Sequence, residues 1–408
     1  MPSGPIRIRI DLLLNFTNTQ NMKTNLLMLT AIHVMIVCCT NVSNPDTCVQ
    51  ITESDIIKSD SSMCDCILDS WEPVFLDDSS VDALLGDVVK VRFDDGLFFI
   101  ESMNGQSGTR TFKVFDRTGR YIRDISHPGR ARNEYVGNIT WTLDPDRNEV
   151  AIIMIGNPFT VKYFDYEGNF LRTVHTDTLS DTCDDGFIAH IMSDGSILME
   201  SLFGSVPTNE FIAIHPDGQA DSIVPMRNWK LGQSEWAVGI FSTNYGQRYL
   251  DSQGGETWFM RALDHHLYRL SDSGQVECVA NLAFLKDASE EEKLNFEMSW
   301  FYSPEFATLL SFVNMKDMLQ FTYGTRAGVR YVYDKNTGSL HEYAYHQTDY
   351  RTVPELIMVN GVYDNTIIGA YTPEPDEDEQ PMQNSPELEA FYRRAAQSEN
   401  PTLVLYHF

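Results

Sequence analysis

The residues best suited to chemistry lie between His127 and Tyr135. This segment carries Arg130, Arg132 and Glu134 in a chain with 30 Lys and Arg residues against 58 Asp and Glu. Arginines hold carboxylates through parallel hydrogen bonds, so Arg130 and Arg132 are candidate ligands for a carboxylate or an acidic sugar. In the alternative, structural interpretation, Glu134 pairs with the arginines, or the segment braces a neighbouring part of the fold.

Trp141 completes the predicted ligand-binding set of Arg130, Arg132, Glu134 and Trp141. An indole ring offers a flat apolar face on which a sugar ring can stack, and the same ring can instead pack as a wedge inside the core. Both interpretations also apply to three other aromatic residues, Trp236, Tyr245 and Trp300.

Signatures of catalysis are missing from the sequence. The chain contains no G-x-S-x-G, no P-loop and no H-E-x-x-H motif. The HEYAYH segment at 341–346 has two histidines five residues apart in a strand-like context, which favours a structural role over metal binding. No catalytic residue is assigned, and the sequence favours a non-catalytic protein over an enzyme.

Metal sites are not predicted either. Cys64 and Cys66 form a C-x-C pair with no second Cys or His pair at ligand spacing. Residues 144–148 begin like a calcium loop, but Glu149 stands where that loop requires glycine, so a hairpin turn is expected. The acidic run at 374–379 is interrupted by proline and is typical of a solvated loop, although calcium binding stays open there. No cofactor is assigned.

The net charge excludes one class of partner. A formal charge of −28 leaves no basic surface for a phosphate backbone, so no nucleic acid is expected.

The first 39 residues are typical of a targeting segment. An apolar stretch of about a dozen residues follows Lys23, which is the length of a signal h-region and too short to span a bilayer. Met22 is the expected true start. The stretch ends at Cys38 and Cys39, a layout that favours lipidation of Cys39 or Cys38, with simple secretion as the alternative. Residues 40–70 are polar and acidic, which predicts a flexible tether.

A repeat of about fifty residues organises the rest of the chain. The segment VFDRTGRYIRDI, with Gly119, is echoed by YFDYEGNFLRTV, whose Gly168 lies 49 residues further on, and weaker copies surround Gly218, Gly274 and Gly338. Each copy places a D-x-x-G or D-x-G turn between two apolar runs, as in a β-hairpin. A second hairpin precedes each copy, beginning at Val91, Trp141, His190, Arg248 and Phe312.

Two hairpins per period predict an all-β, six-bladed β-propeller of four-stranded antiparallel blades over residues 71–408. The strand at 401–408 completes the last blade, and residues 73–76 add its outer strand, which joins the two chain ends. Helical insertions are expected near 287–305, with a capping box at Asp287 and Glu290, and within 372–400, with Ser385 as N-cap and Pro386 at the first helical position.

The FD-x-x-G hairpins, the PGRARNEY stretch and the lipoprotein-like start resemble those of the six-bladed β-propeller lipoproteins of Bacteroides-type bacteria and, more distantly, NHL-repeat and TolB-like propellers. The resemblance covers roughly residues 70–408 and implies an exported protein, periplasmic or on the outer membrane or cell surface, that contacts the membrane only through a lipid anchor. The expected function is non-catalytic binding of a protein partner or a glycan in the envelope. The alternative, by analogy of fold, is a calcium-dependent, lactonase-like hydrolase or lyase that uses the central channel.

Overall fold

The structure is a computed structural model, in which residues 42–408 form one compact unit. The described residues are 48–137, 139–154, 159–176, 186–201, 211–224, 247–249, 256–260, 265–271, 275–285, 309–323, 329–344, 352–356, 358–373 and 385–408. The predicted signal segment and its candidate lipidation residues, Cys38 and Cys39, lie outside these ranges.

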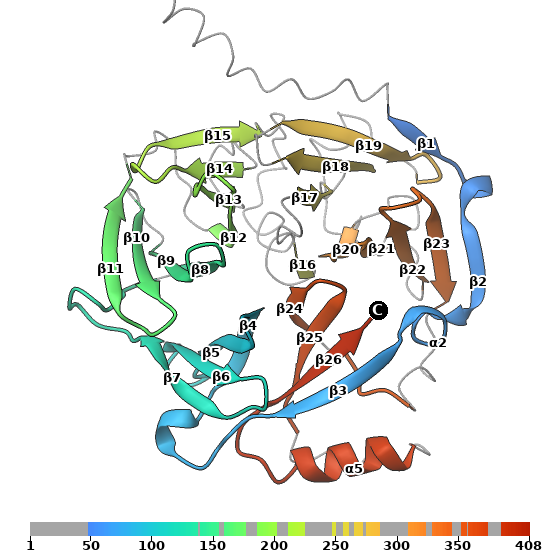
Figure 1. Ribbon diagram of the computed structural model, residues 1–408. Coiled ribbons are helices and arrows are strands. Elements are labelled where there is room, and N and C mark those ends of the chain that lie inside the picture. The colour runs from blue at the N-terminus through green and yellow to red at the C-terminus, as the bar shows by residue number, and fades with distance from the viewer. Residues whose placement is uncertain are drawn as a thin grey trace, which may run out of the picture. The chain divides into compact units, whose positions relative to one another are not determined.

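The described strands form six sheets, numbered here from the first complete hairpin pair (Figure 1). Sheet 1 contains β4 (Asp87–Asp94), β5 (Leu97–Met103), β6 (Arg110–Asp116) and β7 (Tyr121–Ser126). Sheet 2 contains β8 (Ile139–Asp144), β9 (Glu149–Met154), β10 (Thr160–Asp165) and β11 (Phe170–His175). Sheet 3 contains β12 (Gly186–Ile191), β13 (Ile197–Ser201), β14 (Phe211–Ile214) and β15 (Ala220–Val224).

The other three sheets include strands from the start of the described chain. Sheet 4 contains β17 (Glu256–Phe259), β18 (His266–Ser271), β19 (Val276–Leu282) and β1 (Val49–Ile51). Sheet 5 contains β16 (Gln247–Tyr249), β20 (Leu309–Asn314), β21 (Met318–Tyr323), β22 (Val329–Asp334), β23 (Leu340–Ala344) and β2 (Ile57–Ser62). Sheet 6 contains β24 (Val359–Tyr363), β25 (Thr366–Tyr371), β26 (Thr402–His407) and β3 (Ser70–Phe75).

The arrangement is that of a propeller-like all-β protein with five four-stranded sheets, around a common centre onto which strands such as β4, β8, β12 and β24 face (Figure 1). Sheet 5 differs from the expected blade because it has six strands. One of the additional strands is β16, which pairs in parallel with β20. In the described residues, the strands on either side of the predicted hairpin from Arg248 do not pair: β16 joins sheet 5, whereas β17 lies in sheet 4.

The repeated aspartates and glycines shape the predicted turns. Asp116 Oδ1 accepts hydrogen bonds from the backbone N–H of Thr118 at 2.9 Å and of Arg120 at 3.1 Å, while Gly119 adopts a φ of +87°. Asp165 and Gly168 repeat this arrangement between β10 and β11, with a φ of +82° at the glycine. Both are hairpins that the D-x-x-G spacing predicts. Glycine is needed at the last position of the turn because a positive φ is costly for residues with a Cβ.

The core lies between neighbouring sheets. One cluster joins Phe99 and Phe112 of sheet 1 to Trp141 and Ile152 of sheet 2, and further clusters join sheet 2 to sheet 3, and sheet 6 to sheet 1. Each sheet therefore buries both faces against its neighbours, which accounts for the near-continuous apolar character of strands such as β9.

Residues 49–75 form what we call the N-terminal strap. Its strand β1 pairs in parallel with β19, β2 pairs in parallel with β23, and β3 pairs antiparallel with β26, so the strap adds an outermost strand to sheets 4, 5 and 6 in turn (Figure 1). Between the strands lie a 3-10 helix, η2 (Glu53–Asp55), and the short helix α2 (Met63–Ile67). A second 3-10 helix, η3 (Val81–Ala83), follows the strap.

Two sequence-based expectations concern the strap. The predicted pairing of the chain ends is confirmed, since Thr402 to His407 align with Phe75 to Ser70. The expectation of a flexible tether over 40–70 differs from the structure in its described part, where β1 and β2 occupy sheet edges. The physical reason is that an edge strand needs only its backbone groups to pair, so a polar segment such as IKSDSS can form one.

The helix within 372–400 is present as α5 (Pro386–Ala395). Ser385 Oγ accepts from the N–H of Leu388 at 3.2 Å, Pro386 begins the helix, and Arg393 and Arg394 lie in its last turn. Leu388 and Phe391 bury the inner face of α5 against sheet 6. The other expected insertion, 287–305, lies outside the described residues.

Candidate functional site

The segment from His127 to Tyr135 connects the outer strand β7 to the inner strand β8 and is closed on itself. Pro128 and Tyr135 form an isolated β-bridge, the N–H of Gly129 donates to the Tyr135 carbonyl at 2.9 Å, and Ser126 Oγ donates to the Asn133 carbonyl at 2.7 Å. We call residues 127–135 the basic loop. Its shape is set by its own hydrogen bonds, so the side chains at its tip project from a braced backbone.

Tyr135 anchors the basic loop in the core. Its ring is buried and lies edge-on to Phe112, with centroids 5.4 Å apart, and its hydroxyl donates to the Arg110 carbonyl. Burial raises the pKa of Tyr135, with a smaller contribution from the nearby Glu101 carboxylate. The phenol therefore stays protonated and keeps this hydrogen bond at physiological pH.

Glu134 stabilises the loop itself. Its Oε2 accepts a hydrogen bond from the N–H of Ala131 at 2.7 Å, and its carboxylate lies over Gly129, where a Cβ would come within 1.9 Å of Oε2. Lys162 supports the same turn by donating to the carbonyls of Glu134 and Ala131, and burial lowers the pKa of Lys162. Glu134 is thus a positioning residue for the predicted site.

Arg130 and Arg132 are both exposed. The guanidinium of Arg132 lies over the ring of Phe170, 4.7 Å from its centroid, which holds this side chain against sheet 2. Within the described ranges, neither arginine forms an ion pair with Glu134 or with any other carboxylate. Arg130 thus presents a guanidinium to solvent in a strongly acidic chain, and this group can bind a carboxylate with two hydrogen bonds.

Trp141 occupies the wedge position, which is the structural interpretation of this residue. The side chain is 1% exposed, its Nε1 donates to Glu101 Oε2 at 2.8 Å, and its ring lies edge-on to Phe112. Glu101 also pairs with Arg110, and Lys90 Nζ donates to the Trp141 carbonyl at 2.7 Å. Because no ring face is open to a sugar, Trp141 contributes to the seam between sheets 1 and 2 and is left out of the candidate surface. Trp236, Tyr245 and Trp300 lie outside the described residues.

A second surface with arginines was missed by the sequence analysis. A shallow cavity of about 390 Å³ is lined by β3, by the β6–β7 turn and by α5. The guanidinium carbon of Arg394 lies 3.7 Å from the centroid of the Phe75 ring. A guanidinium nitrogen of Arg117 lies 4.0 Å from Glu72 Oε1 in an exposed ion pair. The residues that line the cavity, 72–75, 117–118 and 394, are far apart in the sequence, so no local spacing of residues predicts it. The Glu72 carboxylate already pairs with Arg117, which makes this cavity a weaker anion site than the basic loop.

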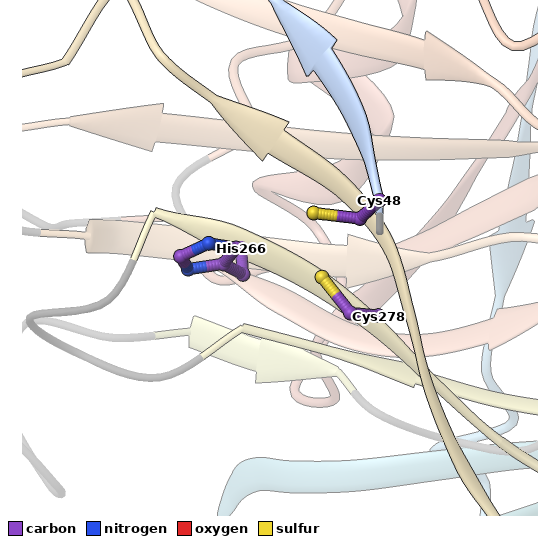
Figure 2. A group of neighbouring side chains, drawn as sticks. All are labelled: Cys48, His266 and Cys278. Atoms are coloured by element: carbon purple, nitrogen blue, oxygen red, sulfur yellow. The ribbon is translucent and has the colours of Figure 1, made fainter. Parts of the chain in front are cut away.

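One group of side chains in the described part of the chain could hold a metal ion. The ligand atoms of Cys48, His266 and Cys278 lie within 4.8 Å of one another (Figure 2). The C-x-C pair, Cys64 and Cys66, which the sequence suggests as a metal-binding candidate, is not part of this group. Cys66 is exposed, and its Sγ lies 3.6 Å from Ser59 Oγ. Cys48 lies more than 200 residues before His266 and Cys278 in the sequence, so spacing gives no signal for the group. Among the described residues, no comparable group consists of carboxylates such as the calcium alternative requires.

Residues 144–149 form the predicted hairpin turn rather than an ion loop. Asp144 pairs with Glu149 across the β8–β9 hairpin, Asp144 Oδ2 accepts from Arg147 at 2.6 Å, and Asn148 takes a φ of +53°. The acidic run at 374–379 lies outside the described residues.

The fold and the sites define a propeller-like all-β protein. A family model described as "Domain of unknown function (DUF4934)" matches residues 49–407, and the chain belongs to this family. The comparison with curated proteins gives no match.

Two solved structures of Bacteroides proteins are similar to this chain. A candidate exported protein of Bacteroides fragilis superposes with a TM-score of 0.59 at 15% identity, over 88% of this chain and 99% of its own. A member of the DUF4221 family from Bacteroides vulgatus gives a TM-score of 0.49 at 12% identity, over 84% and 97%. The first supports the fold. In the described part of this chain, no helix is both long and apolar enough to cross a bilayer.

Proposed function

We propose that this protein is an exported, six-bladed propeller, tethered in the envelope by a lipid on Cys39 or Cys38, that binds a carboxylate-bearing protein partner or glycan through its basic loop without catalysing a reaction. The observation that carries the proposal is the placement of Arg130. Its guanidinium is exposed on a backbone braced by Tyr135 and Glu134, and it has no ion pair with any described residue.

The basic loop is preorganised for binding. A loop that is already ordered loses little conformational entropy when it binds a ligand. The entropic cost of binding therefore cancels little of the free energy that the charged hydrogen bonds of Arg130 contribute. Each hydrogen bond to a charged group contributes about 1.5–3 kcal/mol when it is well formed. Arg132 adds positive charge beside it, while the overall charge of −28 repels acidic partners elsewhere on the surface.

The export part of the proposal is supported by the signal-like sequence before Cys39 and by the fold shared with the candidate exported protein of Bacteroides fragilis. The sixth blade in this proposal is sheet 5, in which β20–β23 supply four antiparallel strands. The more distant relationship to NHL-repeat and TolB-like propellers stays a prediction.

The test is a thermal-shift titration of the mature chain with polygalacturonate, a glycan rich in carboxylates, and with an uncharged glycan of similar length. A ligand present at 100 times its Kd stabilises the native state by about 2.7 kcal/mol. We expect a shift with polygalacturonate alone, and at least about a tenfold loss of affinity in Arg130→Ala, since at least one charged hydrogen bond is removed.

Arg117→Ala is the matched control, because Arg117 is also an exposed arginine and lies outside the basic loop. An equal loss of affinity in both variants would reduce the effect to net charge and contradict the assignment of the loop. If no glycan shifts the melting temperature, the same variant pair is compared in capture of envelope proteins by the immobilised chain. An absence of Arg130-dependent capture there would reject the binding role.

A further inference from the structure

Cys48, His266 and Cys278 meet at the point where the N-terminal strap joins sheet 4 (Figure 2). Cys48 directly precedes β1, His266 begins β18, and Cys278 lies in the middle of β19. The parallel register aligns Val49 with Ala280, which brings Cys48 beside the segment that carries Cys278. Cys48 thus meets two donors that lie more than 200 residues further along the chain, on the neighbouring strands β18 and β19.

The donor set fits zinc. Two cysteine sulfurs and one imidazole nitrogen are ligands that zinc accepts in tetrahedral sites, at about 2.3 Å for sulfur and about 2.0–2.1 Å for nitrogen. Ligand atoms around such an ion lie roughly 3.5–3.8 Å apart by tetrahedral geometry, and here they lie within 4.8 Å. Small side-chain rotations close that difference. Three protein ligands leave the fourth position for water.

The surroundings also suit a metal site. Cys48 and Cys278 are buried, with 9% and 5% exposure, whereas His266 is partly exposed and gives an ion a path of entry. Gln50 Nε2 donates to the Cys48 carbonyl at 3.3 Å, and Asn281 Nδ2 donates to Gln50 Oε1 at 2.9 Å. This chain of hydrogen bonds orders the backbone of Cys48, in the way that outer partners orient metal ligands.

The strap has a structural need for such a link. Strand β1 has three residues, and only Ile51 among them is buried. So short a parallel edge strand has few hydrogen bonds with which to offset the entropy of ordering the segment. A metal ion that joins Cys48 to Cys278 and His266 adds its binding free energy to the docking of β1.

We propose that Cys48, His266 and Cys278 form a zinc site that fastens the N-terminal strap to sheet 4. On binding, the two thiols each release a proton to solvent, the neutral imidazole donates a nitrogen lone pair, and no electron transfer occurs. The proposal is independent of the binding role of the basic loop.

The experiment is a titration of the reduced, metal-free full chain with Zn²⁺, followed by dialysis and measurement of bound metal, and a parallel titration with Co²⁺ as a spectroscopic probe. We expect one ion bound through this site, with sulfur-to-cobalt charge-transfer bands and tetrahedral d–d bands. His266→Gln and Cys278→Ser should each weaken Zn²⁺ binding by more than about 100-fold, the upper range for loss of an outer partner alone.

The control is Cys64→Ser with Cys66→Ser, which removes both cysteines of the strap itself and should leave binding unchanged. His266→Gln keeps the buried cysteines in place, so its loss of Zn²⁺ binding does not depend on a disturbed core, and circular dichroism verifies its fold. Binding that survives both ligand variants overturns the proposal. So does binding lost equally in the control, the absence of any binding, or a Cys48–Cys278 disulfide found in the protein isolated without reductant.

Discussion

Gly119 lies against Phe75 so closely that a Cβ on Gly119 would come within 2.1 Å of the Phe75 carbonyl oxygen. The Gly119 carbonyl in turn accepts the N–H of Asp77 at 2.7 Å. The glycine belongs to the β6–β7 turn of sheet 1, and Phe75 belongs to the outer strand of sheet 6. The same contact recurs between Gly168 and Asp124 and between Gly218 and His175, so in these three turns the repeated glycine docks the turn onto the preceding sheet.

This relationship predicts a large cost for Gly119→Ala. The new methyl group would clash with backbone and would also have to adopt the positive φ, so we expect a loss of about 3 kcal/mol or more in the free energy of unfolding. Gly96→Ala is the matched control, because Gly96 has a φ of +75° with nothing within 4 Å of its Cβ position. It should lose only about 1 kcal/mol. Urea unfolding measures both, and equal losses would show that the close approach has no energetic role.

Trp141→Phe should destabilise the seam between sheets 1 and 2. The substitution removes the N–H that donates to the buried Glu101 carboxylate, and a hydrogen bond to a charged group contributes about 1.5–3 kcal/mol. Trp71→Phe is the comparison, since Trp71 Nε1 donates to the neutral carbonyl of Thr352 at 3.0 Å and is more exposed. We expect a smaller loss there, near 1 kcal/mol. The reverse order in chemical denaturation would contradict this account of the seam.

Lys335 should make stability depend on pH. Burial lowers the pKa of Lys335 from 10.5 to about 8, and its Nζ donates to Asn314 Oδ1 at 2.7 Å. The folded chain therefore binds fewer protons than the unfolded chain between pH 8 and 10.5, so stability rises with pH in that window. Relative to Lys335→Met, the wild-type chain should gain about 2 kcal/mol between pH 7.5 and 9.5.

The measurement is guanidinium unfolding of both proteins across that range, with Lys316→Met as a control because Lys316 is exposed. Tyrosines of raised pKa, such as Tyr163, act in the opposite direction near pH 10 and cancel in the difference between proteins. A flat difference between wild type and Lys335→Met would refute the assignment.

Ile51 should decide whether the strap stays docked. Its side chain is 4% exposed and packs with Leu282, whereas Val49 on the same strand is 63% exposed. Ile51→Asp buries a charge without a partner, and we expect β1 to detach, with faster amide exchange and protease cleavage before Ile57. Val49→Asp should leave both rates at the wild-type level. Equal protection in the two variants would mean that β1 does not depend on this contact.

The repeated hairpins could be predicted from the sequence because their signal is local. An aspartate and a glycine three residues apart, between alternating apolar runs, determine a turn wherever they occur, and the cap of α5 was predictable from Ser385 and Pro386 for the same reason. The position of the basic loop between two sheets followed from the order of the hairpins.

Long-range pairing could not be predicted in the same way. Strand β2 is mostly exposed and polar, so nothing in its own residues distinguishes an edge strand from a tether. The convergence of Cys48 with Cys278 depends on that pairing and has no spacing of its own. Two roles were possible for Trp141 because an indole ring can stack on a sugar or pack inside the core, and only the burial of the side chain distinguishes the two.

The strap also constrains the order in which the chain can mature. Its three strands align with residues 280–282, 341–344 and 402–407. A ribosome or a translocation channel delivers the strap first, yet the partner of β3 is delivered last. Strand β1 must therefore wait until residues 280–282 are delivered and β3 until residues 402–407 are delivered, and contacts of such long sequence separation form slowly.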